Sequence, residues 1–245
     1  MDLRKHRRSH YIYHYLAQAV KILLLGAIVL STFFTANRID FSHFFPISTV
    51  RVYGIRHVEP SDVQQLLTPL VRAGFFNTNI DYIRDQLRQM PWIYDISVKR
   101  QWPDQLDIIL IEKTAVAYWN NDMLLSESGE LFSPKRATYP PALPRLIGPD
   151  GQQIVMLSYF KDINRLLSPL HAKIASLELT SYRTWKLTLD NGIMLQIGHK
   201  DILTRLNHFV KVYPKIVGER AKDVEYIDLR YPNGVAVRWK APLET

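Results

Sequence analysis

The sequence predicts an α+β protein with three parts: a single N-terminal transmembrane helix, a small β-α-α-β-β domain, and a second, antiparallel β-rich domain with helices. Three observations support this prediction. Residues 16–36 form one long apolar run. Apolar residues recur at helical spacing between residues 59 and 90, and they alternate with a period of two from residue 92. Helices in one part of a chain, followed by strand hairpins, are typical of the α+β class.

The apolar run at residues 16–36 fits one membrane crossing. At about 1.5 Å per helical residue it spans about 31 Å, close to the hydrocarbon thickness of a bilayer. Lys21 lies near its N-terminal end, where a long side chain can reach the headgroups. A buried helix and a cleaved signal peptide are the alternatives. Cleavage after Ala36 would place bulky Phe34 where a small residue is required, so we favour an uncleaved anchor.

The charges beside this run predict its orientation. The tail at residues 1–15 is basic, with Arg4, Lys5, Arg7 and Arg8 opposed only by Asp2, whereas Arg38 and Asp40 cancel after the run. By the positive-inside rule the tail is cytoplasmic and the rest of the chain lies across the membrane. The aromatic residues 41–46 are expected at the outer interface, where rings with a polar edge are favoured.

Composition excludes several classes of function. The net charge is +8, but residues 1–21 carry five Lys or Arg and one Asp, so +4 of it belongs to the membrane anchor. The remaining +4 is spread over the rest of the chain, and we therefore expect no nucleic-acid partner. Since the chain contains no cysteine, disulfides, zinc-cysteine sites and thiol nucleophiles are excluded.

The small domain is predicted at residues 45–113. A short strand is expected at 47–54, followed by a helix that begins at 59–62 and ends at Gly74, and by a second helix at 81–90 that Pro91 stops. From residue 93 the period is two, which predicts strands at 93–102 and 106–112 around a turn at 103–104. Two helices on one face of three strands make a sufficient small core.

The β-rich domain is predicted at residues 114–245, with a sheet built from successive hairpins. Strands are expected at 116–119, 123–126, 130–132, 173–180, 185–189, 193–197, 224–231 and 235–239, with a surface passage at 134–149. The turns Asp190-Asn-Gly192 and Pro232-Asn-Gly234 carry Asn-Gly pairs, which tight hairpins favour. Helices are expected at 154–167, through Val155, Tyr159 and Ile163, and at 201–217.

No constellation of residues in the sequence predicts catalysis, a metal or a cofactor. His199 and His208 stand nine residues apart, which is not a ligand spacing on a helix, and no glycine-rich phosphate loop occurs. We therefore expect no small-molecule substrate. The pairs Asp104 with Asp107, or Glu127 with Glu130, leave a cell-wall glycosidase as an alternative. Acids in turns and on strand surfaces are the commoner explanation of such pairs.

The last predicted strand is a candidate docking site for another polypeptide. Val235 and Val237 lie on a strand that is expected to have a free edge, which an extended segment of another chain can complete. Arg230, Tyr231 and Trp239 are residue types that anchor interfaces. The alternative is that Tyr231 and Trp239 simply pack on the helix behind them.

Motifs in both domains resemble a known family. The small domain resembles a POTRA domain, and the whole chain, including its single apolar run, resembles the FtsQ/DivIB family of bacterial cell-division proteins. The motifs are Phe45-Pro-Ile-Ser, Val52-Tyr-Gly54, Pro91-Trp-Ile93, Val98-Lys-Arg-Gln-Trp-Pro-Asp104, Glu112-Lys113, Ala117-Tyr-Trp119, Gly129-Glu-Leu-Phe132, Leu143-Pro-Arg-Leu-Ile-Gly-Pro-Asp-Gly151 and Asp228-Leu-Arg-Tyr-Pro-Asn-Gly-Val-Ala-Val-Arg-Trp239. Their order and spacing carry the resemblance, since each motif alone is weak.

The resemblance implies a non-catalytic scaffold of the divisome. Such a protein is a single-pass type II protein of the inner membrane, periplasmic beyond its span and concentrated at the septum. In FtsQ-like proteins the C-terminal edge docks the FtsB/FtsL pair, and Arg230, Tyr231 and Trp239 fall on the matching motif, with Asn233 as a turn residue. A secretion or outer-membrane assembly component is the alternative, because POTRA domains bind polypeptides there too.

Overall fold

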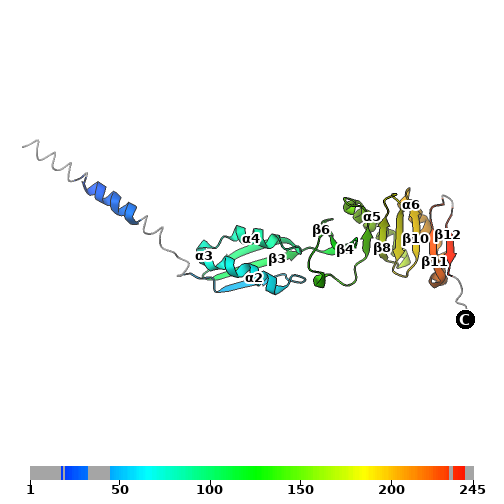
Figure 1. The fold of residues 1–245 in the computed structure, drawn as a ribbon, viewed down its shortest axis with the longest axis horizontal. Helices are drawn as coiled ribbons and strands as arrows, with labels where there is room; N and C mark the ends of the chain where they lie inside the picture. The colour runs from blue at the N-terminus through cyan, green and yellow to red at the C-terminus, as the bar shows by residue number, and fades with distance from the viewer. Residues whose placement is uncertain (1–17, 19, 33–44, 232–233, 241–245) are drawn as a thin grey trace, which may run out of the picture.

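The computed structural model describes residues 18, 20–32, 45–231 and 234–240. Figure 1 shows two sheets that follow one another along the chain, each accompanied by helices. The element order and the grouping of helices against the sheets fit the predicted α+β class.

The predicted membrane span lies only partly within these residues. Residues 20–32 are helical and all of them are exposed, whereas residues 16, 17, 19 and 33–36 lie outside the described residues. Among the helices of the described part, none combines the length and the apolar character that crossing a bilayer requires. The span at residues 16–36 therefore stays a prediction of the sequence.

The first sheet has three strands in the order β1-β3-β2. They are β1 (Thr49–Tyr53), β2 (Ile93–Gln101) and β3 (Gln105–Glu112). β1 runs parallel to β3, with Val50 opposite Leu106, and β2 forms an antiparallel hairpin with β3, with Val98 opposite Ile108. Leu106, Ile108 and Leu110 are buried on one face of β3, as its period of two predicts.

In the first domain, the C-terminal end of the first helix differs from the prediction. They are α2 (Pro60–Leu70), the 3-10 turn η2 (Val71–Ala73), α3 (Gly74–Asn77) and α4 (Ile80–Arg88). The expectation that the first helix runs up to Gly74 is wrong, because α2 ends at Leu70. Gly74 has φ +81°, which costs glycine little, and it turns the chain from η2 into α3.

The second sheet has nine strands in the order β12-β11-β10-β9-β8-β7-β4-β5-β6. They are β4 (Ala115–Trp119), β5 (Met123–Ser126), β6 (Leu131–Phe132), β7 (Arg145–Ile147), β8 (Ile174–Leu179), β9 (Trp185–Leu189), β10 (Met194–Gly198), β11 (Val224–Asp228) and β12 (Ala236–Trp239). Its helices are α5 (Gln153–Leu167) and α6 (Ile202–Ile216), with 3-10 turns η3 (Arg136–Thr138), η4 (Ser168–Leu170) and η5 (Gly218–Asp223).

The prediction of an antiparallel sheet built from successive hairpins is wrong for three strand pairs. β4 pairs with β7, β7 with β8, and β10 with β11, and all three pairs are parallel. Parallel neighbours need a crossover, usually a helix. α5 supplies the crossover from β7 to β8, and α6 supplies the one from β10 to β11. The predicted hairpins between β4 and β5, β8 and β9, β9 and β10, and β11 and β12 are confirmed.

Two further expectations about the second domain are corrected. Residues 134–149 are not only a surface passage, because β7 lies within them and Leu146 is fully buried in the sheet. The inner face of α5 carries Met156, Leu157, Ile163 and Leu167, whereas Val155 is 45% exposed. Ile163 is buried as predicted. At the start of the helix, however, the buried residues are Met156 and Leu157 rather than the predicted Val155.

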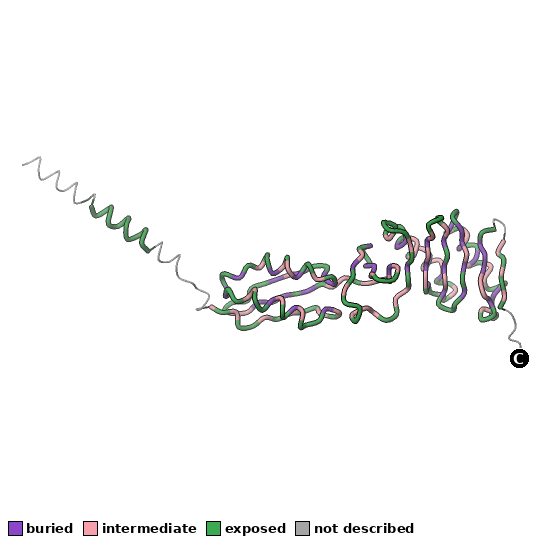
Figure 2. Tube along the Cα trace, viewed as in Figure 1, coloured by how far each residue is buried: buried purple, intermediate pink, exposed green. Residues whose placement is uncertain are grey.

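Residues of the second domain complete the apolar core of the first domain. Figure 2 shows the buried positions concentrated along the strands of both sheets. Ile83 and Leu87 of α4 are fully buried against Leu106 and Ile108 of β3. Leu124 of β5 and Phe132 of β6 belong to this same cluster. The two domains therefore share apolar packing across the point where β3 ends.

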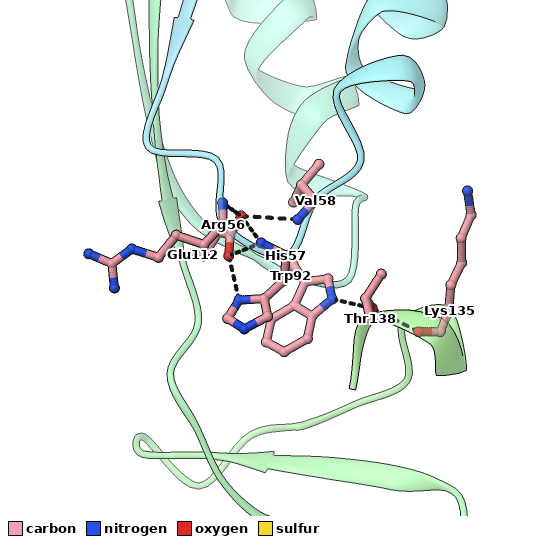
Figure 3. A network of polar contacts seen from close by, with 7 residues as sticks. All are labelled: Arg56, His57, Val58, Trp92, Glu112, Lys135 and Thr138. Carbon is pink, nitrogen blue, oxygen red and sulfur yellow. Dashed lines mark hydrogen bonds and ion pairs between the residues drawn. The ribbon is translucent and has the colours of Figure 1, made fainter. Parts of the chain in front are cut away.

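Glu112, the last residue of β3, holds the loop between β1 and α2 (Figure 3). Its carboxylate accepts the backbone N–H groups of Arg56 at 2.7 Å, His57 at 3.0 Å and Val58 at 3.1 Å, and it lies 2.9 Å from His57 Nδ1. The side chain is only 5% exposed. Burial raises the pKa of Glu112, but these hydrogen bonds outweigh burial and hold the pKa below its usual value.

Trp92 contacts both this loop and residues of the second domain. The His57 ring stacks on the Trp92 ring at a centroid distance of 4.3 Å, and Phe132 packs edge-on to Trp92 at 5.0 Å. The Trp92 indole N–H donates to Thr138 Oγ1 at 2.8 Å, and the Thr138 hydroxyl donates to the carbonyl of Lys135 (Figure 3). The junction between the domains is therefore both apolar and hydrogen-bonded.

Two ion pairs lie beside this junction, one with a nearly buried lysine, Lys113, and one with an exposed lysine, Lys135. Lys113 Nζ lies 2.7 Å from Glu130 Oε1, and Lys135 Nζ lies 2.7 Å from Asp62 Oδ2 on α2. The hydrogen bond with Asp62 raises the pKa of Lys135 above its usual value. Because an exposed ion pair such as Lys135–Asp62 contributes little stability, we attribute the stability of the junction mainly to its buried groups.

Replacing Thr138 with valine is expected to lower the free energy of unfolding by about 1 kcal/mol, because the buried Trp92 N–H loses its acceptor. Urea denaturation followed by tryptophan fluorescence measures this loss. Thr68→Val is the matched control, since the Thr68 hydroxyl is exposed and bonds only within α2. Equal losses from the two variants would contradict a role for Thr138 in the junction.

Candidate functional site

β12 is an edge strand of the nine-stranded sheet (Figure 1). It pairs antiparallel with β11, with Ile227 opposite Val237 and Asp228 opposite Ala236. Along its other side, no strand of the described part of the chain pairs with it. An edge strand presents a row of backbone N–H and C=O groups that an extended segment can pair with. This edge is the candidate site.

The side chains of β12 alternate between the core and solvent. Val235, Val237 and Trp239 are half-buried and pack against the core of the second domain, whereas Ala236 and Arg238 are exposed. The guanidinium of Arg220 lies 4.1 Å from the centre of the Trp239 ring, within the range of a cation–π contact. Trp239 therefore packs on its own domain, as the alternative interpretation of this residue states.

Arg230 is fixed in place by a buried acid beside this edge. Its Nε and Nη2 donate to the two carboxylate oxygens of Asp228 at 2.9 and 2.7 Å, and its backbone N–H donates to Oδ1 at 2.9 Å. The Asp228 side chain is 8% exposed and that of Arg230 is 56% exposed. The hydrogen bond from Arg230 lowers the pKa of Asp228, and burial only partly opposes this effect. Asp228 thus holds a charged, accessible guanidinium in one orientation.

Gly198 makes room for the arginines that surround Asp228. It has φ +91°, and a Cβ there would lie 2.9 Å from Arg205 Nη1 and 3.3 Å from Arg230 Cγ. The Arg205 guanidinium donates to the carbonyl of Ile197 at 2.7 Å, and its charge also lowers the pKa of Asp228. A side chain at residue 198 would therefore strain the backbone, and it would require the end of Arg205 to shift.

Replacing Asp228 with asparagine is expected to lower the free energy of unfolding by about 1 kcal/mol, because a neutral amide accepts on one oxygen and leaves the charges of Arg205 and Arg230 uncompensated. Urea denaturation at neutral pH measures the change. Asp223→Asn is the matched control, since the Asp223 side chain is 61% exposed in a long ion pair. A loss from Asp228→Asn no larger than that from the control would contradict the structural role of this acid.

The structure brings most of the predicted site residues to one end of the second sheet. Arg230 and Tyr231 follow β11, and Tyr231 is 57% exposed. Val235, Val237 and Trp239 lie on or next to β12, and Asn233 lies outside the described residues. The prediction from sequence missed Asp228, although Asp228 and Arg230 lie two residues apart in the strand predicted at 224–231, a spacing that places both on one face of such a strand.

Arg220 and Arg238 also belong to this end of the sheet, but no pattern in the sequence indicates their roles. Arg220 comes from η5, and only the fold brings it to Trp239. Arg238 on β12 pairs with Glu225 on β11 at 3.1 Å, and its guanidinium lies 5.8 Å from the centre of the Tyr226 ring. The exposed surface beside the edge thus combines fixed cations with aromatic rings.

The acid pairs named as an alternative catalytic site lie elsewhere. Asp104 accepts backbone N–H groups from Ser48 and Thr49 through its carbonyl, and the Asp107 carboxylate accepts from the Gln105 amide. Glu130 pairs with Lys113, and Glu127 is exposed in a turn. Within the described residues, no group of three or more His, Cys, Asp or Glu side chains is placed to hold a metal ion.

Comparison with known families assigns both domains. Residues 117–230 match the family described as cell division protein FtsQ/DivIB, C-terminal. Residues 45–113 match the POTRA domain of the FtsQ type. The first matched range ends at Arg230, so it covers the sheet up to β11.

Relatives named Cell division protein FtsQ match most of the chain. That of Escherichia coli K12 is 34% identical over 229 residues, covering 91% of this chain and 80% of the relative. That of Shewanella oneidensis is 32% identical over 243 residues, covering 97% and 92%. That of Coxiella burnetii is 36% identical over 184 residues, covering 75% and 76%. The chain belongs to the FtsQ/DivIB family of cell division proteins.

Proposed function

We propose that this protein is a non-catalytic scaffold of the bacterial divisome, which holds other septal proteins by docking the FtsB/FtsL pair at the edge of β12. Family membership supports a role in cell division with partners among the division proteins. The single observation that carries the docking proposal is the edge position of β12, beside which no other strand is found in the described residues. An extended segment of FtsB or FtsL adds to this edge as a further antiparallel or parallel strand.

Residues 16–36 anchor this scaffold in the inner membrane, with the basic tail in the cytoplasm and both domains in the periplasm. The length and apolar character of the run and the charge difference across it support this topology. Protease treatment of spheroplasts tests it. Both domains are expected to be digested from outside, and protection of the domains would overturn the assigned orientation.

The side chains at the edge give the docking site its specificity. Strand addition supplies main-chain hydrogen bonds that any extended segment can make, so selection among partners comes from side chains beside the strand. Arg230, held by Asp228, offers a fixed cation, and Tyr231 offers an exposed ring. Side chains of these two types concentrate binding energy at interfaces.

Hydrogen–deuterium exchange tests the docking proposal directly. Addition of the FtsB/FtsL complex is expected to protect the amides of β12 that point away from β11. β6 is the matched control, because it is the edge at the opposite end of the same sheet. Complex formation without protection of β12, or equal protection of β6, would overturn docking by strand addition. Accumulation of a fluorescent fusion at midcell tests the role in division separately.

A further inference from the structure

Exposed aromatic side chains gather at the end of the first domain where the chain enters it. Trp102 is 74% exposed and Phe76 is 55% exposed, although both are large apolar groups. Trp102 lies between β2 and β3, and Phe76 lies in α3, so they come from distant parts of the sequence. Together with Phe45, which enters the domain, we call them the aromatic end.

Contacts within the domain bring these residues to the same end. The Phe45 and Phe76 rings pack edge to face at a centroid distance of 5.2 Å, and the Phe75 N–H donates to the Phe45 carbonyl at 2.8 Å. The aromatic end therefore includes the entry point of the chain. Figure 1 shows α3 at the end of the first domain that lies farthest from the second sheet.

The turn between β2 and β3 belongs to the same end. The Asp104 carbonyl accepts the backbone N–H groups of Ser48 and Thr49, which follow Phe45 closely in the chain. Arg100, near the end of β2, donates to the Thr78 carbonyl just beyond α3 at 2.6 Å. Trp102 therefore projects from the end of the domain that also carries Phe45 and Phe76.

We infer that the aromatic end docks into the headgroup region of the bilayer, and that the first domain thereby rests on the membrane surface. This inference rests on the anchor proposed above at residues 16–36. The nine peptide steps from Ala36 to Phe45 (45 minus 36) span at most about 30 Å when fully extended, so the aromatic end stays within reach of the headgroups.

The chemistry of the aromatic end suits a lipid interface rather than bulk water. Tryptophan concentrates at headgroup depth, where its ring is shielded and its N–H edge stays hydrated, and the apolar rings of Phe45 and Phe76 are favoured there because they leave water. Arg72 in η2 and Arg100 are exposed cations at the same end and can pair with lipid phosphates. Of the nearby acids, Asp81 is paired with Arg84, and Asp104 is half-buried in its turn.

Because the connection to the proposed anchor is short, even weak contacts are enough to hold the aromatic end at the bilayer surface. A tether of this length holds its end at an effective concentration in the mM range, so even a site with a dissociation constant near ~1 mM is about half occupied. Docking would fix the height and direction of the first domain above the membrane. It would also set how far the docking edge at β12 stands from the bilayer.

Quenching of Trp102 fluorescence by brominated lipid tests this inference in the full chain. The chain is reconstituted into nanodiscs of phosphatidylethanolamine and phosphatidylglycerol, with and without bromine on the acyl chain near the headgroup. The difference between the wild-type and Trp102→Phe spectra isolates the emission of Trp102 from that of the other four tryptophans. We expect a blue-shifted emission that brominated lipid reduces by about half or more. Phe76→Ser is expected to weaken this quenching.

A matched control places the same probe far from the membrane. Tyr182 is 89% exposed between β8 and β9, so Tyr182→Trp in the Trp102→Phe background gives an accessible tryptophan in the second domain. This probe is expected to respond to bromine very little. If the chain stays in the nanodiscs and both probes respond alike, docking is overturned while the anchor stands. If the chain fails to stay in the nanodiscs, the anchor and the docking are both overturned.

Discussion

Replacing Glu112 with alanine is expected to lower the free energy of unfolding by about 3 kcal/mol. The carboxylate is the common acceptor for the backbone N–H groups of Arg56, His57 and Val58, and it contacts the His57 ring. Without it, these donors lose a charged acceptor whose side chain is only 5% exposed, and the His57 and Val58 bonds to it are partly buried. The stacked His57 and Trp92 rings also lose their support, so the loss extends into the domain junction.

Urea denaturation of residues 45–245, followed by tryptophan fluorescence, measures this effect. Lys135→Ala is the matched control, because the Lys135 side chain is 57% exposed and forms an ion pair with Asp62 at the same junction. Losing such an exposed pair is expected to cost much less stability. If both variants lose the same stability, the buried hydrogen bonds of Glu112 do not hold the junction.

The lowered pKa of Glu112 gives this prediction a dependence on pH. Because the pKa is lower in the folded state than its ordinary value of 4.5, the unfolded state binds the proton more tightly. The stabilisation is therefore complete above pH 4.5 and is lost as the pH falls through the folded-state pKa. The difference in stability between the wild type and Glu112→Gln is expected to shrink in that acid range. A difference independent of pH would contradict the assigned charge state.

The sequence predicts elements whose signal is local, and it misses pairings that form over long distances. The hairpin of β2 and β3 follows from its alternation and its short turn, and Asn-Gly predicts the turn between β9 and β10. The parallel pairing of β10 with β11 has no such signal, because α6 separates the strands in sequence. β7 is missed because three residues within a proline-rich passage show no period.

The same difference between local and long-range signals applies to the candidate site and to the junction between the domains. The edge strand β12 follows from a local hairpin, and Arg230 and Tyr231 follow from residue type. Asp228 and Arg220 gain their roles only when the fold brings them to Arg230 and Trp239. At the junction, Phe132 packs on Trp92 across the predicted boundary at residue 113, a contact that periodicity within either domain cannot indicate.

Replacing Tyr231 with alanine is expected to weaken the affinity for the FtsB/FtsL complex by about 2 kcal/mol, or roughly 30-fold. Tyr231 is 57% exposed and follows Arg230 in the chain, next to the edge at which we propose that the partner docks. A ring that becomes buried by a partner contributes apolar area and a hydroxyl with little entropy to lose. Isothermal titration calorimetry with the purified complex measures the change.

Tyr231 tests docking more cleanly than Trp239 does. Trp239 packs on the core of its own domain and under Arg220, so Trp239→Ala is expected to lower both affinity and stability. Tyr231→Ala removes a side chain that leaves most of its surface in water, so the free energy of unfolding is expected to stay within about 0.5 kcal/mol of the wild type. A loss of binding by this variant therefore reports on the interface rather than on the fold.

Tyr182→Ala is the matched control for this experiment, because Tyr182 is also an exposed tyrosine in a turn, but between β8 and β9. Its replacement is expected to leave the affinity unchanged. Equal affinities of wild type, Tyr231→Ala and Tyr182→Ala would count against docking beside β11 and β12, even if the complex still forms. Equal weakening by both variants would instead point to contacts spread over the second domain, because strand addition at one edge concentrates the loss near that edge.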